Sequence, residues 1–167
     1  MRDFSRPTDQ RLAMMRNLAT DLLWNGKVKT TLEKAKDLKS YAEKILTKAI
    51  NTYEDTVKVV KTTVDAKGVK AEREVLNDGP KKLQARRAIM AKLYSVKEQK
   101  APKESKTAFK ARTKDIKNPL IEKIFNELAP KYAKRKAELG TGGGYTKIVK
   151  LGTRLGDNAE TALIEFI

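Results

Sequence analysis

The chain has 167 residues, no cysteine and no histidine, and its 37 basic and 21 acidic residues give a formal net charge of +16. The missing cysteine excludes disulfides, thiolate zinc sites and thiol nucleophiles, and the missing histidine removes the commonest general base and metal ligand. Most hydrolytic and transition-metal chemistry is therefore not expected, and the positive charge predicts an acidic partner, with nucleic acid ahead of an anionic membrane surface or an acidic protein.

The first predicted element is an amphipathic helix. Pro7-Thr8-Asp9 is typical of a helix start, apolar residues then recur with helical spacing, and Asn25-Gly26 supplies a stop. Residues 1–21 are charged and contain no apolar stretch of signal-peptide length, and no run of about 18 apolar residues occurs in the chain. We therefore expect a soluble protein that is not exported.

A short strand and a second helix follow. Residues 27–31 predict a strand around Val28. Thr30 and Glu33 have the spacing of a capping box, which predicts the start of a helix whose apolar stripe runs through residues 35–49. Most lysines of this helix face the other way, so we interpret the stripe as part of the core.

The middle of the chain predicts a hairpin and two further helices. Valines on both sides of the turn-forming residues 65–68 indicate an inserted β-hairpin over residues 57–76. A third helix is expected over residues 80–96. A fourth begins at Asn118-Pro119, where asparagine can cap and proline can occupy the first turn, and its buried face reaches Leu128.

The last predicted elements are two strands. They cover residues 144–151 and 160–167 and are joined by a turn-rich segment. The predicted fold class is α+β, with about four helices packed on a small mixed β-sheet and an inserted β-hairpin.

The positive charge is unevenly distributed along the chain. Residues 81–117 contain 13 basic and 3 acidic residues, a net of +10, whereas residues 51–80 have a net of −1. Within the basic stretch, residues 97–117 contain too few apolar side chains to bury much surface. Two interpretations stay open for this run: a solvated linker, or a basic arm that becomes ordered on a phosphate backbone.

No motif in the chain indicates catalysis. The glycine-rich run 140–144 is not followed by the Gly-Lys-Ser/Thr of a phosphate loop. Glu72 and Glu74 lie on one side of a predicted strand but beside basic residues, so we interpret them as solvated charges. The ten aromatic residues are scattered, which disfavours base stacking. We therefore expect recognition of the phosphate backbone, with arginine ranked above lysine because it can form two parallel hydrogen bonds.

Several stretches of the chain together carry a family resemblance. They occur in a specific order and spacing: 11–18 (RLAMMRNL), 29–36 (KTTLEKAK), 85–87 (ARR), 125–132 (FNELAPKY), 143–152 (GGYTKIVKLG) and 163–167 (LIEFI). Any one of these motifs is weak, but in sequence they are quite specific. The chain resembles the bacterial large-subunit ribosomal protein seventeen family.

The resemblance implies a structural rRNA-binding component of the bacterial large ribosomal subunit, acting in translation, with no catalysis and no cofactor. Its implied partners are large-subunit rRNA and neighbouring large-subunit ribosomal proteins, without a membrane or a small-molecule substrate, and its implied location is the cytoplasmic ribosome. Two alternatives stay open. Charge alone does not distinguish RNA from DNA, so an architectural DNA-binding protein is one; the other is a metal-dependent nuclease, which the absence of clustered acids disfavours.

The candidate RNA-binding residues combine the arginines outside the lysine-rich runs with positions in the matching stretches, including the family's basic first helix, central arginine pair and final hairpin. They are Arg2, Arg6, Arg11, Arg16, Asn17, Lys34, Lys36, Arg86, Arg87, Tyr145, Lys147, Lys150 and Arg154. No catalytic or metal-binding residue is predicted.

The chain also departs from the family's pattern. We expect a single domain over residues 1–167, with insertions near 52–80 and 97–117 that exceed the family's common length. In the final hairpin, Thr153 and Leu155 stand where the family often has proline and a second arginine. This difference leaves Arg154 alone and weakens the phosphate grip expected there.

Overall fold

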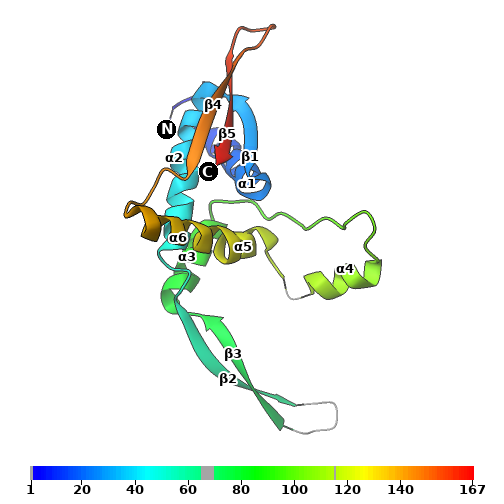
Figure 1. The fold of residues 1–167 in the computed structure, drawn as a ribbon. Coiled ribbons are helices and arrows are strands. Elements are labelled where there is room, and N and C mark those ends of the chain that lie inside the picture. Colours follow the sequence, from blue (N-terminus) through cyan, green and yellow to red (C-terminus); the bar gives the residue numbers. More distant parts are fainter. Residues whose placement is uncertain (1, 65–69, 115) are drawn as a thin grey trace.

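The computed structural model describes residues 2–64, 70–114 and 116–167. In chain order the elements are α1 (Thr8–Asn25), β1 (Lys27–Thr31), α2 (Leu32–Ile50), β2 (Thr56–Val64), β3 (Lys70–Asp78), α3 (Pro80–Met90), α4 (Lys106–Thr113), α5 (Pro119–Lys123), the π-helical turn η1 (Ile124–Leu128), α6 (Ala129–Leu139), β4 (Thr146–Thr153) and β5 (Glu160–Phe166). Figure 1 shows a body from which the β2–β3 hairpin and α4 project in different directions.

The three-stranded sheet has the order β1-β5-β4. β5 pairs antiparallel with both neighbours, and Ile164 lies opposite Val28 on β1 and Ile148 on β4. The predicted α+β class is confirmed, but the sheet is antiparallel throughout instead of mixed. A short turn joins β4 to β5, and such a link permits only antiparallel pairing. β1 lies on the other edge of β5 and also runs against it.

The apolar stripe of α2 forms the centre of the core. Leu38, Ala42 and Leu46 have no exposed surface, and α2 contacts α1, α3, α6 and the sheet. On the sheet side, Ala162 and Ile164 of β5 are equally buried. The prediction that the stripe belongs to the core is confirmed, and burial of this face turns the opposite, lysine-bearing face of α2 toward solvent.

The start of α2 differs from the predicted capping box. Thr31, not Thr30, precedes the first helical residue, and its side chain makes no capping hydrogen bond. Glu33 instead forms ion pairs with Arg2 (2.7 Å) and Lys36 (2.8 Å). The capping-box prediction is wrong, because the helix starts one residue later than the box requires: Glu33 is the second helical residue, and its carboxylate binds the two cations.

α3 ends at Met90, earlier than the predicted end at Val96. The chain leaves the helix where its backbone finds a partner on α1: the Tyr94 N–H donates to the Thr20 hydroxyl at 3.1 Å. Leu93 is still buried. The apolar pattern over residues 80–96 is therefore only partly correct: Ile89 and Leu93 are buried, but Leu83 and Met90, which it also places in the core, are exposed.

The predicted fourth helix continues beyond Leu128, through η1 and α6, to Leu139. Pro130 lies in its middle and has no N–H to donate to the preceding turn. The turn before it is widened, because the Ala129 N–H bonds to the Ile124 carbonyl, five residues earlier instead of four. This π-helical turn accommodates the proline, and the helix extends further than apolar periodicity indicated.

β2 and β3 form the predicted antiparallel hairpin, and its predicted turn, residues 65–68, lies outside the described residues. The hairpin extends away from the body (Figure 1). Asp55 holds its base, because the Asp55 carboxylate accepts the backbone N–H groups of Lys81 (2.8 Å) and Lys82 (3.2 Å) in the first turn of α3.

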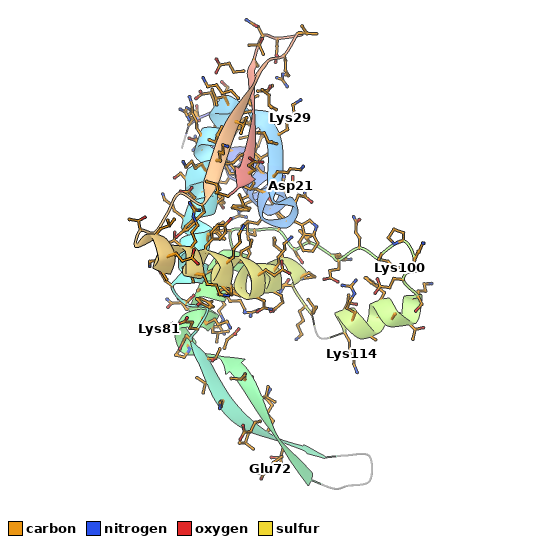
Figure 2. The ribbon with its side chains drawn as sticks, viewed as in Figure 1. Asp21, Lys29, Glu72, Lys81, Lys100 and Lys114 are labelled. Carbon is orange, nitrogen blue, oxygen red and sulfur yellow. The ribbon has the colours of Figure 1, made fainter. Side chains whose placement is uncertain are left out.

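Replacing Asp55 with alanine is expected to lower the free energy of unfolding by about 1 kcal/mol, because the first turn of α3 loses a charged acceptor. Urea denaturation followed by circular dichroism measures this loss. Asp21→Ala is the matched control, at an exposed position of α1 (Figure 2). An equal loss in both variants would show that Asp55 does not act as a helix cap.

Candidate nucleic-acid interface

An open groove of about 620 Å³ runs along the outer face of α2. Its lining residues are Lys36, Lys39, Ser40, Glu43, Lys44, Thr47, Lys48 and Lys92. Residues three or four positions apart share one side of a helix, so burial of the apolar stripe gathers these polar residues on the solvent side. We call this set the lysine groove.

The lysine groove is strongly positive. Glu43 is its one acidic lining residue, and the Glu43 carboxylate accepts hydrogen bonds from the Thr146 N–H (3.2 Å) and hydroxyl (2.8 Å) on β4. Lys36 is paired with Glu33 at 2.8 Å. Among the residues that the structure describes, the other four lysines of the groove have no salt bridge, so their charges can act on an external anion.

Two of the predicted arginines hold carboxylates of the chain itself. Arg2 forms ion pairs with Glu33 (2.7 Å) and Asp37 (3.0 Å), which tie the N-terminal segment to the start of α2. Arg11 pairs with Asp3 at 2.7 Å. Both guanidinium groups therefore fix the course of the N-terminal segment.

The remaining predicted residues of α1, α2 and the segment before them reach solvent to different extents. Arg6 and Asn17 are exposed, whereas Arg16 and Lys34 are half-buried. Burial raises the pKa of Tyr41, and the nearby Arg16 guanidinium opposes that rise. The positive charge of Arg16 thus acts on the partly buried Tyr41 phenol.

The two arginines of the predicted central pair have different surroundings: Arg86 is half-buried and Arg87 is exposed. Arg86 lies between Asp78 (2.7 Å) and Glu122 (2.5 Å), with its guanidinium 5.3 Å from the centre of the Phe125 ring. Burial lowers the pKa of Arg86, but the two carboxylates outweigh it and the net shift is upward. Arg87 is exposed and has no salt bridge within the described part of the chain.

Tyr145, at the start of the final hairpin, faces the core. It is 3% exposed, and its ring centre lies 5.0 Å from that of Tyr132 on α6. The Tyr132 hydroxyl in turn donates to the carbonyl of Ile167 at 3.0 Å. Tyr145 thus belongs to an aromatic cluster that holds α6 against the sheet.

The other predicted residues of the final hairpin are at its surface. Lys147 and Lys150 are exposed on β4. Arg154 forms an ion pair with Asp157 at 2.5 Å, and this hydrogen bond raises the pKa of Arg154. The pair closes the turn between β4 and β5.

The comparison with known sequences identifies the family. A sequence model described as Ribosomal protein L17 matches residues 14–167. The chain belongs to the ribosomal protein L17 family. Similar relatives, each named Large ribosomal subunit protein bL17, come from Lachnospira eligens (38% identical, covering 99% of this chain and 98% of the relative), Acetivibrio thermocellus (35%, 99% and 98%) and Clostridium acetobutylicum (31%, 99% and 96%).

Membership of the L17 family confirms the resemblance inferred from the sequence motifs. The family is a structural component of the ribosome and not an enzyme, which agrees with the prediction of no enzymatic function. It gives no support to the alternatives of a nuclease or an architectural DNA-binding protein. Among the described residues, no helix is long and apolar enough to cross a membrane.

Four lysines of this L17-family chain were not predicted as site residues: Lys39, Lys44, Lys48 and Lys92. The first three carry a recognisable signal, since they lie opposite the apolar stripe of α2 at helical spacing. Lys92 carries none, because it reaches the groove from chain that was predicted to continue α3. Spatial proximity between α2 and the segment after α3 is visible only in the fold.

Proposed function

We propose that this L17-family protein is a structural component of the large ribosomal subunit that binds rRNA through its phosphate backbone. It acts in translation, on the cytoplasmic ribosome. Its relatives are named as large-subunit proteins. The observation that carries the proposal is the lysine groove. Four of its lysines have no salt bridge among the described residues, and they line one open surface beside α2, whose opposite face is buried in the core.

The lysine groove suits phosphate recognition better than base recognition. A lysine ammonium is a compact charge that binds phosphate without reading sequence. The groove lining contains no aromatic side chain on which a base could stack. Because the core fixes α2, the backbone of its lysines is ordered before RNA arrives, and binding costs less conformational entropy.

The predicted site residues divide by their surroundings into two groups. We assign direct RNA contacts to those whose polar groups face solvent or are half-buried without a described salt bridge: Arg6, Arg16, Asn17, Lys34, Arg87, Lys147 and Lys150. The others stabilise the surface that carries these contacts: Arg2, Arg11, Lys36, Arg86 and Arg154 through ion pairs, and Tyr145 through the core.

The β2–β3 hairpin suits a neighbouring ribosomal protein. Residues 51–80 have a net charge of −1, in contrast to the basic remainder of the chain. Among the described side chains of the hairpin, the exposed large apolar ones are Val57, Val59, Val60 and Leu76. A nearly neutral arm gains little from phosphates, whereas exposed valine and leucine favour contact with a protein surface. A free two-stranded hairpin is only marginally stable, so such a contact would also stabilise it.

Co-sedimentation in sucrose gradients at high magnesium tests the proposed function. We expect the protein in the large-subunit fraction and not with the small subunit. Recovery at the top of the gradient with intact subunits present would contradict the proposal, and preferential binding to duplex DNA over rRNA would favour the DNA-binding alternative.

The affinity for isolated large-subunit rRNA is expected to fall steeply with salt. Each neutralised phosphate contributes about −0.7 to −0.9 to the slope of log K against log salt, so about six contacts give a slope of roughly −4 to −5. Filter binding between about 50 and 200 mM salt measures this slope. A nearly flat dependence would contradict recognition dominated by phosphates.

A further inference from the structure

The basic run that follows α3 is more ordered than either a linker or a mobile arm. Residues 97–114, which we call the α4 arm, contain α4 and the loop before it, and stand to one side of the body (Figure 1). α4 has eight residues and buries none of them. A helix this short is not stable in water by itself, so other contacts must hold it.

Contacts within the arm supply this support. The Ser105 hydroxyl accepts the Ala108 N–H at 3.1 Å and caps α4. Arg112, in the last turn, reaches back to the loop and forms ion pairs with Glu104 (3.1 Å) and Glu98. Arg112 and the Ala101 N–H lower the pKa of Glu104, because both stabilise its charged carboxylate. The Arg112 guanidinium also lies 5.6 Å from the centre of the Phe109 ring.

This arrangement separates the charges of the arm. Its two acidic residues, Glu98 and Glu104, both bind Arg112. The lysines of the arm are all exposed, and none has a described salt bridge: Lys97, Lys100, Lys103, Lys106, Lys110 and Lys114. Figure 2 shows Lys100 in the outer part of the arm and Lys114 at the end of α4 nearer the body. The acids are thus used to hold the helix, and the lysines are left to an external anion.

The spacing of the helix lysines points to a polyanion. Lys106, Lys110 and Lys114 are four residues apart, so they follow one face at intervals of about 6 Å. Like charges at this spacing repel and weaken a helix, and a row of phosphates would relieve the repulsion. No large apolar side chain of the arm is strongly exposed, so the arm lacks the apolar anchor that a protein partner would use.

We infer that the α4 arm is a second, preformed RNA-binding element, which grips the phosphate backbone of an RNA segment other than the one in the lysine groove. Figure 1 shows α4 on the side of the body away from α2, which supports two separate RNA contacts. The inference rests on the proposed function, because it takes RNA as the ligand.

The double variant Glu98→Gln/Glu104→Gln tests the role of the internal contacts. It raises the net charge by two, so long-range attraction alone would strengthen binding to large-subunit rRNA. We expect the opposite, a loss of about tenfold, because α4 must then be ordered by the RNA itself. The matched control is Asp21→Asn/Glu138→Gln, which makes the same charge change at exposed positions of α1 and α6.

Hydrogen exchange and a lysine variant complete the test. Amides of α4 are expected to lose protection in the Glu98→Gln/Glu104→Gln variant while the body keeps its melting temperature, since α4 buries no residue. Lys106→Gln/Lys110→Gln/Lys114→Gln is expected to reduce the salt slope by about 2, as each lost phosphate contact contributes about 0.7 to 0.9.

The outcomes separate the two proposals. If the wild-type protein does not bind rRNA, the proposed function fails. If the wild-type protein binds but the glutamate variant binds as tightly as its control, the inference about the arm fails. An unchanged salt slope in the lysine variant, combined with reduced incorporation into subunits, would indicate a protein partner and would also overturn it.

Discussion

Replacing the four lysines of the groove that have no described salt bridge with glutamine is expected to weaken binding to large-subunit rRNA about 100-fold at physiological salt, and to reduce the salt slope by about 3. The substituted residues are Lys39, Lys44, Lys48 and Lys92. They act together because three of them share one face of α2, whose backbone the core already holds. Filter binding over a salt series measures both quantities.

A variant of equal charge separates the groove from general attraction. Glutamine at four exposed lysines outside it, Lys58, Lys61, Lys134 and Lys136, lowers the net charge by the same amount. We expect a much smaller loss of affinity in this control. Both variants should fold, because the substituted side chains are exposed or half-buried and glutamine is nearly as good a helix former as lysine at the positions on α2 and α6. Equal weakening of both would show that RNA responds to total charge and that the groove is not a site.

The helix α2, which carries most of the lysine groove, also shows how much of the fold can be predicted from sequence patterns. The stripe through residues 35–49 identified the buried face of α2 correctly, because a helix with one apolar side has one way to face a core. The ends of the helices were less predictable. After the end of α3, the Tyr94 N–H donates to the Thr20 hydroxyl on α1. A π-helical turn lets the last helix continue through Pro130. These effects depend on partners that are distant in sequence or on local adjustment.

The same limit applies to the candidate site. Residue type ranks arginine above lysine as a phosphate ligand, but it does not tell whether a carboxylate already holds that arginine. Arg2 meets its partners Glu33 and Asp37 only in the fold, because they are 31 and 35 residues away along the chain. Among the described arginines chosen from the sequence, several thus have internal partners, whereas Lys39, Lys44 and Lys48 on α2 have no salt bridge among the described residues.

Arg86 provides the sharpest test of this distinction. Its side chain is 20% exposed and joins β3 to α5 through Asp78 and Glu122. Arg86→Gln leaves two partly buried carboxylates without their cation, and we expect the free energy of unfolding to fall by about 3 kcal/mol. Urea denaturation monitored by circular dichroism and by tryptophan fluorescence measures the loss. Coincident transitions would agree with our proposal that residues 1–167 form one domain.

Arg87→Gln is the matched control, since this neighbouring residue loses the same charge from an exposed position. We expect a change in unfolding free energy within about 0.5 kcal/mol. The RNA measurements should show the reverse order: Arg87→Gln reduces the salt slope by about 1, whereas Arg86→Gln, studied at a temperature where it is folded, leaves the slope unchanged. If Arg86→Gln retained its stability and lost RNA affinity, Arg86 would be a phosphate ligand and its ion pairs with Asp78 and Glu122 would be incidental to the fold.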